Sequence, residues 1–453
     1  MSIRGFLQRN VWAAERHRAT ARLLDEIGSF DPAARPNPYL AALVRDAAAN
    51  VPYYRDTLAP FADPVASFAA LPLIDRQTIR REFDRMRHDT SDRAGWFTTT
   101  TSGSTGMPLS VIHDTAHKNW VRATEAWHFR NMLGIDPTES PMVVFWASSE
   151  YIWGKRRSLS KTIDLWLGQT DLLGATRFTP AEMREGIEAI NRRRPVVIKS
   201  YASPLYQIAK HIRANNIRIH RPRVVFSLAE TMRPFMRETI EDVFGAPVRD
   251  FYGTREVGPI AGQCAHGRMH LFSFHAHLEL LDDHGRPVPP GGEGRVVLTA
   301  LHNRAMPLLR YEIADRAVAA PATPCPCGCP LPSIERVVGR RTDYFPTANG
   351  TLVYGGHFIK MMYDAGWVDE FRVIQPRMDV IEIHYVPARE CLPDEKAFIE
   401  TRVRNIMGAA CAVEWHRHDT LPPGPYGKHM YIISNVAGAN APKDPVPAGD
   451  AGA

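Results

Sequence analysis

Hydrophobic positions follow different patterns along the 453-residue chain. Residues 1–95 have apolar positions at helical spacing between proline-rich turns, which predicts a set of short helices. From residue 96 to about residue 320, short apolar runs alternate with helical stretches, as where the run 195–201 precedes the stretch 203–216. Strand–helix alternation is typical of an α/β sheet. We therefore predict an α/β fold with mixed or parallel sheets flanked by helices.

Some individual elements can also be predicted from this pattern. The charged stretch 75–86 predicts a helix, and Gly245 is a natural stop for a helix over 231–245. Continuous β-like segments over 270–281 and 306–318 predict long strands that form a β subdomain of the same lobe.

A break over residues 339–350 separates this large lobe from a shorter unit. The shorter unit alternates predicted strands with a helix over 393–408, which indicates a small α+β domain. We predict a large domain over 1–342, a small mobile domain over 343–436, and an unstructured Ala/Pro/Gly-rich tail over 437–453.

Composition narrows the class of protein. Hydrophobic residues make up 44% and charged residues 23%, which excludes a largely disordered chain. No apolar run approaches the roughly 18 residues that span a bilayer. The net charge of +6 comes mostly from dispersed arginines, which favours small anionic ligands over a nucleic-acid surface. We expect an enzyme with no nucleic-acid or membrane partner.

The first 28 residues mix arginine and glutamate among their apolar positions, which predicts an amphipathic helix rather than a secretion signal. We expect this helix to pack onto the body of the protein, with a membrane-surface helix as the alternative. Six cysteines are few for a secreted disulfide scaffold, and three crowd into 325–329. The expected location is the cytoplasm.

The stretch TTTTSGSTGMP (98–108) is the most informative motif. Its glycines allow sharp turns that present backbone N–H groups, and its hydroxyls add donors suited to phosphate oxygens. The motif is not a P-loop, because no Gly-Lys-Ser/Thr follows. A flexible linker is the alternative. The residues of the candidate loop are Ser102, Gly103, Ser104, Thr105 and Gly106.

Further along the chain, other motifs contain an aromatic side chain, carboxylates and a lysine that could contact a nucleotide. In DFYGTREVG (250–258), Tyr252 could stack on a base and Glu256 could hold Mg²⁺ through oxygen, unless the motif is only a tight turn. Asp315 follows an apolar strand and could accept hydrogen bonds from two neighbouring hydroxyls, as a ribose offers. A GRRTD motif and a late Gly-flanked lysine, Lys428, complete the series, although Lys428 could be a solvated surface residue.

Taken in this order, over roughly residues 60–436, the motifs resemble those of the adenylate-forming superfamily. The segment LPLIDRQTIRREF (71–83) and the Cys-x-Cys-Gly element resemble its phenylacetate–CoA ligase-like branch, which includes CapK-type capsule proteins. The resemblance implies ATP- and Mg²⁺-dependent conversion of a carboxylic acid, aryl or arylacetic, to an acyl-adenylate. Pyrophosphate leaves, and the acyl group passes to CoA.

The resemblance also implies roles in a nucleotide site. The loop 102–106 would hold the β- and γ-phosphates, Tyr252 would lie against adenine and Glu256 would bind Mg²⁺. Asp315 and Arg340 would bind the ribose. The remaining positions assigned to this site are Ala229, Glu230, Asp250, Phe251 and Gly253, with Ser227 as a pocket wall.

Lys428 would contact both the carboxylate and the α-phosphate, with Glu256 and Thr105 completing the catalytic set. Asp343 would be the hinge about which the small domain rotates. Two departures from the family pattern stand out. Ala314 replaces the usual glycine before the ribose aspartate, which is tolerable if φ is negative there, and the usual Pro-Arg-Thr upstream of the lysine is missing.

Four residues form a candidate zinc site. A Cys-x5-His pair and a Cys-x-Cys pair supply three thiolates and one imidazole, a set typical of closed structural sites. Some phenylacetate ligase-like proteins resemble this pairing. The four residues are Cys264, His270, Cys325 and Cys327. Cys329 could replace Cys327, His266 competes with His270, and reduced free thiols are the alternative to a metal.

Two other functions remain open from the sequence. The acyl group could pass to an amine or a carrier protein in a biosynthetic pathway, or the chain could be a non-catalytic nucleotide-binding homologue. A homodimer is possible. The histidines His275, His277 and His302 show no helix-spaced metal pair, so we expect them to be surface or satisfied core residues.

Overall fold

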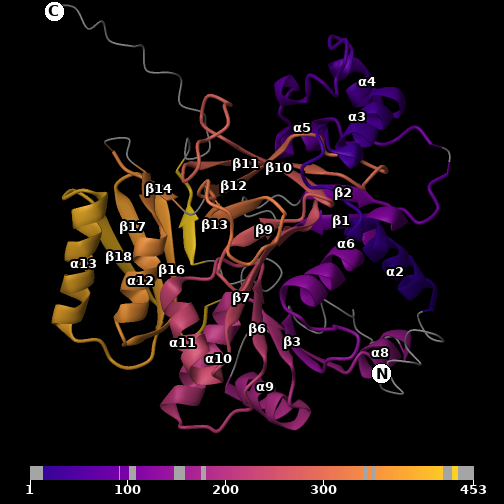
Figure 1. Ribbon diagram of the computed structural model, residues 1–453. Helices are drawn as coiled ribbons and strands as arrows, with labels where there is room; N and C mark the ends of the chain where they lie inside the picture. The colour runs from indigo at the N-terminus through magenta and orange to yellow at the C-terminus, as the bar shows by residue number, and fades with distance from the viewer. Residues whose placement is uncertain are drawn as a thin grey trace, which may run out of the picture. The chain divides into compact units, whose positions relative to one another are not determined.

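The structure is a computed structural model in two compact units, the first running to Val338 and the second beginning at Gly339 (Figure 1). It describes residues 14–90, 92–101, 109–146, 159–174, 180–340, 344–348, 352–421 and 431–436. The predicted limits 1–342, 343–436 and 437–453, and the mobility of the small domain, stay predictions.

The first unit is built around one large mixed sheet. Its eleven described strands run in the order β10-β11-β12-β13-β9-β8-β7-β6-β5-β3-β4. Strands β4, β3, β5, β6 and β7 pair in parallel. The pairs β7–β8, β8–β9, β9–β13, β12–β11 and β11–β10 are antiparallel. The strands are β3 (Met142–Trp146), β4 (Thr170–Gly174), β5 (Val197–Ser200), β6 (Val224–Leu228), β7 (Val248–Thr254), β8 (Gly258–Gln263), β9 (Met269–Leu271), β10 (Ala276–Leu281), β11 (Glu293–Ala300), β12 (Tyr311–Ala319) and β13 (Ser333–Arg340).

Helices cover both faces of the parallel half. Gly186 of α9 lies against Phe145 of β3, while on the other face Lys199 of β5 forms an ion pair with Glu125 of α6. Buried strands covered in this way read as nearly continuous apolar runs, which is why the sequence pattern was informative here. The helices are α6 (Thr115–Trp127), α8 (Leu159–Leu167), α9 (Pro180–Arg193), α10 (Ala202–Ala214) and α11 (Pro234–Phe244), and a π-helical turn over His128–Met132 follows α6.

The predicted helix over 231–245 is shorter in the structure. It begins at Pro234, because proline fits the first turn of a helix, and it ends before Gly245, which adopts φ of 57°. The single strand predicted over 270–281 is wrong, because β9 and β10 are separated by a turn at 272–275 whose phenylalanine side chains are buried. The strand predicted over 306–318 begins only at Tyr311.

The N-terminal region is helical, as predicted. It contains α2 (Ala14–Gly28), α3 (Pro38–Asn50), α4 (Pro52–Leu58), a 3-10 turn (Phe68–Ala70) and α5 (Arg76–Arg81). Leu23 and Ile27 of α2 are buried in the core, so this helix packs onto the body of the protein. The helix predicted over 75–86 is limited to α5, which Asp75 caps. No described helix has the length and hydropathy to span a bilayer.

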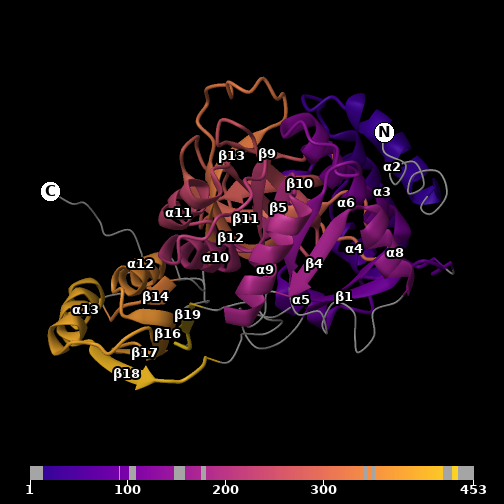
Figure 2. The same cartoon turned by 90° about the horizontal axis from the view of Figure 1, so that it is seen from below.

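The second unit is a small α+β structure, as predicted. A four-stranded sheet of order β18-β17-β16-β19 and a β14–β15 hairpin are accompanied by two helices, which Figure 2 shows on one side of the sheet. Its elements are β14 (Tyr344–Pro346), β15 (Leu352–Tyr354), α12 (Gly356–Asp364), β16 (Val368–Arg377), β17 (Val380–Pro387), α13 (Pro393–Met407), β18 (Ala412–Arg417) and β19 (Ile432–Ser434). Phe371, Ile383 and Tyr385 are buried on the helix-covered face.

Candidate functional site

Two of the predicted nucleotide-site residues lie in direct contact. Tyr252 on β7 donates a hydrogen bond from its hydroxyl to Oδ2 of Asp315 on β12, over 2.7 Å. Asp315 is buried, at 7% exposed. A phenol and a carboxylate that are 63 residues apart in the chain thus form one polar contact. A carboxylate can accept about four hydrogen bonds, so Asp315 retains the capacity to accept from ribose hydroxyls.

Glu256 lies in the turn after β7, and its carboxylate is almost fully buried at 3% exposed. Its Oε1 atom forms an ion pair with Nη2 of Arg76 over 3.2 Å and accepts a hydrogen bond from the Tyr311 hydroxyl over 3.4 Å. Both contacts use Oε1, so a cation would approach Oε2. The sequence assigns no role to Arg76, although this residue lies within the segment 71–83 that resembles the family. Arg76 and Glu256 are 180 residues apart in the chain.

The turn that carries Glu256 is tied to a separate hairpin. This hairpin consists of β1 (Phe97–Thr101) and β2 (Leu109–His113), which pair antiparallel with Thr101 opposite Leu109. Arg255 donates from Nη1 to the Thr100 carbonyl over 2.9 Å, and the Arg255 carbonyl lies 3.1 Å from Nε2 of His113. The strands on either side of segment 102–108 are therefore joined to the turn next to Glu256.

Several predicted site residues lie outside the described residues. They are the loop Ser102, Gly103, Ser104, Thr105 and Gly106, together with Asp343 and Lys428. Arg340 ends β13, but its side chain is not described. The roles of all these residues stay predictions.

Ala314 does not meet the condition under which alanine would be tolerable here, because its φ is 70°, in the left-handed region, and not negative. Ala314 keeps the backbone conformation that a glycine would favour, with its side chain exposed to solvent. Ala229, which follows β6, also has a positive φ of 64°.

A polar row crosses three parallel strands near the carboxyl ends of β5 and β6. Ser200 on β5 pairs in register with Ser227 on β6, which pairs with Asp250 on β7. Both serine hydroxyls are fully buried and have no hydrogen-bond partner among the described residues. Burial raises the pKa of Asp250 to about 6, although Arg237 opposes the shift. Ligands of open α/β sheets bind at this edge of the strands.

Four other predicted positions lie on or directly after strands β6 and β7. Ala229 and Glu230 follow β6 directly. Phe251 is a core residue whose ring centroid lies 5.2 Å from that of Phe226. At Gly253 a Cβ atom would lie 3.0 Å from the carbonyl oxygen of Gly258, so the close approach of β7 and β8 favours glycine. The motif thus also closes a tight turn, the alternative interpretation of the sequence.

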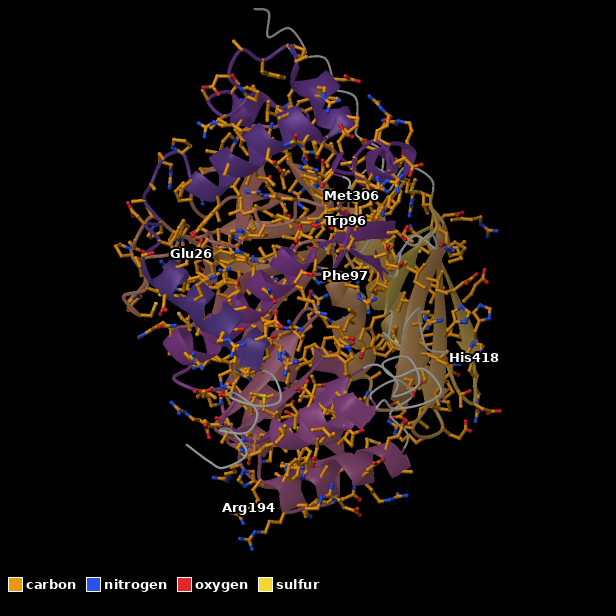
Figure 3. All side chains as sticks on the ribbon, turned by 90° about the vertical axis from the view of Figure 1, so that its right-hand side faces the viewer. Glu26, Trp96, Phe97, Arg194, Met306 and His418 are labelled. Atoms are coloured by element: carbon orange, nitrogen blue, oxygen red, sulfur yellow. The ribbon has the colours of Figure 1, made fainter. Side chains whose placement is uncertain are left out.

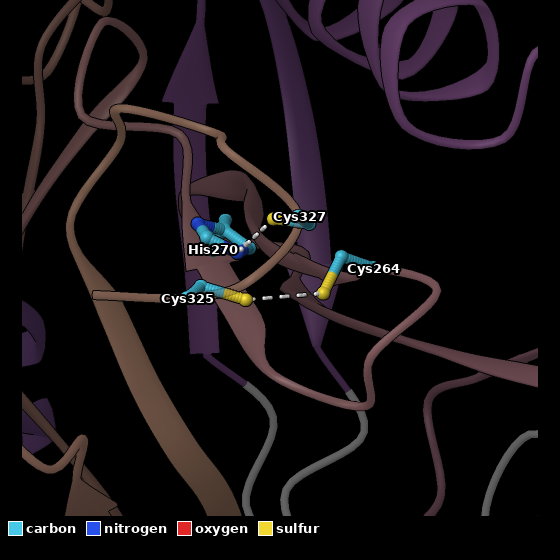
Figure 4. Close-up of side chains that lie close together, drawn as sticks. All are labelled: Cys264, His270, Cys325 and Cys327. Atoms are coloured by element: carbon cyan, nitrogen blue, oxygen red, sulfur yellow. Dashed lines mark hydrogen bonds between the residues drawn. The ribbon is translucent and has the colours of Figure 1, made fainter. Parts of the chain in front are cut away.

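The four predicted zinc ligands converge (Figure 4). Their sulfur and nitrogen atoms all lie within 4.8 Å of one another. Cys264 Sγ lies 3.7 Å from Cys325 Sγ, and Cys327 Sγ lies 3.2 Å from His270 Nε2. In a tetrahedral site with Zn–S bonds of about 2.3 Å, two sulfurs stand about 3.8 Å apart. The donor set and spacing therefore fit a zinc ion.

Outer contacts orient these ligands. His270 Nδ1 lies 3.2 Å from the Leu331 carbonyl, so Nδ1–H can donate there and leave the Nε2 lone pair directed at the cluster. Neither Cys329 nor His266 belongs to the cluster, which favours Cys327 and His270 over these alternatives. Burial, together with neighbouring thiols, raises the pKa of Cys327 to about 11, so a bound cation would be needed to make it a thiolate.

Comparison with known proteins identifies relatives of this chain. The family described as AMP-binding enzyme matches residues 67–302, just over half of the chain. Protein CapK of Staphylococcus aureus is 22% identical over 384 residues, covering 82% of this chain and 81% of that protein. Phenylacetate-coenzyme A ligase of Thermus thermophilus is 29% identical over 168 residues, covering 36% of this chain and 37% of the ligase.

Solved structures confirm the fold. A 2-hydroxyisobutyryl-CoA ligase, crystallised in the postadenylation state, superposes with a TM-score of 0.68 at 18% identity and 88% coverage of both chains. The anthranilate CoA ligase AuaEII in complex with anthranoyl-AMP gives a TM-score of 0.52 at 18% identity, covering 73% of this chain and 65% of that one. The α/β architecture predicted from the sequence is that of these ligases.

Proposed function

The chain belongs to the family of AMP-binding enzymes, and we propose that it activates a carboxylic acid with ATP and transfers the acyl group to CoA. One observation carries the proposal. The turn bearing Glu256 is bonded through Arg255 to the strands that bound the Ser/Thr/Gly segment, and the same strand β7 carries Tyr252 onto Asp315. The groups proposed for base, ribose and metal thus lie in the same region of the first unit as the strands that flank the proposed phosphate segment.

The proposed roles follow from the chemistry of each group. Asp315 accepts the ribose hydroxyls while Tyr252 fixes the orientation of its carboxylate and presents a ring to adenine. Glu256 would hold Mg²⁺ through its carboxylate, and Arg76 forms an ion pair with Oε1 of that carboxylate. Mg²⁺, when bound, would neutralise charge on the phosphate oxygens. The backbone of 102–106 would bind the β- and γ-phosphates.

Adenylation brings two anions together, because a substrate carboxylate attacks the α-phosphorus. The substrate acid is already ionised near neutral pH, so no general base is required. Catalysis therefore depends on positioning and on cationic and N–H groups that screen the charge on the α-phosphate, which is the role proposed for Lys428. Rotation about Asp343 would then withdraw Lys428 and admit the thiol of CoA.

A pyrophosphate-exchange assay tests this function. The protein is incubated with ATP, Mg²⁺ and labelled pyrophosphate over a panel of aryl, arylacetic and short aliphatic acids, and acyl-CoA is measured when CoA is added. We expect exchange with at least one aryl or arylacetic acid, thioester formation with CoA, and no exchange for Lys428→Ala. Exchange without thioester would favour an amine or carrier-protein acceptor. No exchange with any acid would contradict the proposal and favour a non-catalytic homologue.

We also propose that the cluster of Cys264, His270, Cys325 and Cys327 holds a structural Zn²⁺ ion. The site links the β8–β9 connection to the β12–β13 connection and has no open position for substrate. Metal analysis of the purified protein should find this zinc and should find one equivalent less in Cys325→Ser. Equal zinc contents in the two proteins would contradict the assignment. The cytoplasmic location and the homodimer stay predictions.

A further inference from the structure

The small unit carries a second group of metal-binding side chains, which the proposed function does not use. Strand β17 contains Glu382 and His384 in a Glu-x-His pattern, and β18 contains Glu414 and His416 in the same pattern. His418 follows β18 directly and is labelled beside the strands in Figure 3. Residues two apart on a strand point to the same face, so both patterns expose their polar groups on one side of the sheet.

The pairing of the two strands brings these groups together. Glu382 lies opposite Glu414, and His384 lies opposite His416 in the parallel register. The alternate residues on β17, Ile383 and Tyr385, are buried on the helix-covered face. The Glu/His face is therefore the face that the helices leave uncovered, and its side chains are held by two hydrogen-bonded strands rather than by a loop.

The ligand atoms of Glu382, His384 and His416 all lie within 4.8 Å of one another. Oε2 of Glu382 lies 3.2 Å from Nε2 of His384, and the rings of His384 and His416 stack with centroids 4.6 Å apart. Nε2 of His416 is shielded from solvent and has no hydrogen-bond partner among the described residues, and the carboxylate of Glu414 lies 3.9 Å away. A ring nitrogen in this position can serve as a metal ligand.

An outer contact orients His384. Its Nδ1 lies 3.0 Å from Nε2 of His418, so Nδ1–H can donate to His418 while Nε2 stays directed at Glu382. This is the arrangement by which histidine ligands are usually fixed in metal sites. On the neighbouring strand β16, Arg372 pairs in register with His384, and the negative charge of Glu370 acts on that guanidinium. Carboxylates thus outnumber the cation on this face.

We propose that Glu382, His384 and His416 bind one divalent transition-metal ion, Zn²⁺ or its neighbours Ni²⁺ and Cu²⁺. Two imidazoles and one carboxylate suit these ions, whereas Mg²⁺ and Ca²⁺ require mainly oxygen ligands. Three protein ligands leave a position for water or a further donor. The ion joins β17 to β18, which is the edge strand of its sheet, and therefore stabilises the small unit.

The test uses metal-free full-length protein without an affinity tag, titrated with Zn²⁺ and followed by calorimetry. We expect the Cys325→Ser protein, the parent in this test, to keep one Zn²⁺ site. Adding His416→Ala or Glu382→Gln to this parent should lower the affinity of that site for Zn²⁺ by at least about tenfold. The matched control is His284→Ala, an exposed histidine in the turn after β10, which should bind as the parent does. Zn²⁺ should also raise the melting temperature of the parent more than that of His416→Ala.

Cobalt distinguishes this site from the cysteine cluster even if Cys325→Ser fails to fold. Co²⁺ bound by thiolates gives sulfur-to-metal charge-transfer absorption, whereas Co²⁺ bound by imidazole and carboxylate does not. We expect the wild-type chain to bind one equivalent of Co²⁺ that gives no charge-transfer absorption. The His416→Ala chain should not bind this equivalent. Zn²⁺ and Co²⁺ binding that is the same in His416→Ala, Glu382→Gln and the parent would overturn the proposal.

Discussion

At the residue scale, Ala314 is the clearest point of strain next to the candidate site. Its φ of 70° brings Cβ close to backbone atoms, which costs an L-residue about 1–2 kcal/mol. Its side chain is exposed, so removing the methyl group loses little packing. A glycine here would relieve the strain but would add about 0.4–1 kcal/mol of unfolded-chain entropy.

We therefore expect Ala314→Gly to raise the free energy of unfolding by about 0.5–1 kcal/mol, the difference between these two effects. Urea denaturation followed by circular dichroism measures this change. Ala317→Gly is the control, because Ala317 is fully buried in the same strand without a positive φ and should destabilise the protein. A loss of stability in Ala314→Gly similar to that in Ala317→Gly would contradict the argument.

Tyr252 provides a second residue-scale test, one that separates its ring from its hydroxyl. Tyr252→Phe keeps the ring that would lie on adenine and removes the 2.7 Å hydrogen bond to Asp315. A hydrogen bond to a charged group contributes about 1.5–3 kcal/mol, so the KM for ATP in pyrophosphate exchange should rise at least about tenfold. Thr254→Ala, a change two residues away on the same strand, is the comparison. An unchanged KM in Tyr252→Phe would show that the Tyr252 hydroxyl does not orient Asp315 for the ribose.

The sequence was informative where chemistry depends on residue type and spacing. It predicted the four members of the Cys/His cluster, and it assigned Tyr252 and Asp315, which are in contact, to one site. It missed Arg76, because an ion pair across 180 residues leaves no local pattern. It left the φ of Ala314 open, and the structure places this residue in the left-handed region.

At the element scale, sequence patterns predicted which elements exist better than where they end. The parallel strands were found because burial on both faces produces apolar runs, whereas 270–281 was read as one strand although it contains a turn. Buried phenylalanines continue the apolar pattern through that turn, so hydrophobicity alone does not mark it. The sequence does not indicate that the Glu-x-His patterns on β17 and β18 form one group, because only the register of the two strands brings them together.

The Cys/His cluster makes an element-scale prediction, because it joins the β8–β9 and β12–β13 connections. Cys264 and Cys325 are 61 residues apart, so a shared metal would close a long loop of the chain. In Cys325→Ser, amide hydrogen exchange over 320–332 should rise at least about tenfold, while exchange in β5 to β7 stays unchanged. Cys391→Ser, which removes a thiol outside the cluster, should leave both regions as in wild type. Unaltered exchange over 320–332 would show that the metal does not hold these loops.

At the scale of the whole molecule, buried histidines couple stability to pH. Burial lowers the pKa of His128, His275 and His277 to about 4 and that of His302 to about 3. In the unfolded chain these groups titrate near about 6.5. Between pH 6.5 and 4 the unfolded state therefore binds more protons than the folded state, and stability must fall as the pH falls. Asp250 acts in the opposite direction, because its raised pKa lets the folded state bind one proton below about pH 6.

Four histidines less one aspartate leave a net difference of about three protons, to which the lowered pKa of buried His117 adds. The free energy of unfolding should therefore fall by about 4 kcal/mol or more per pH unit near pH 5. Because a domain is typically stable by about 5–15 kcal/mol, the protein should unfold before pH 4 although it is stable at pH 7. Urea denaturation at pH 5, 6, 7 and 8 measures the slope. His275→Gln should reduce it by about one proton, since the amide can still donate to the Val257 carbonyl that His275 contacts. The exposed His284→Gln should leave the slope unchanged, and a stability that is flat from pH 7 to pH 5 would contradict neutral burial of these rings.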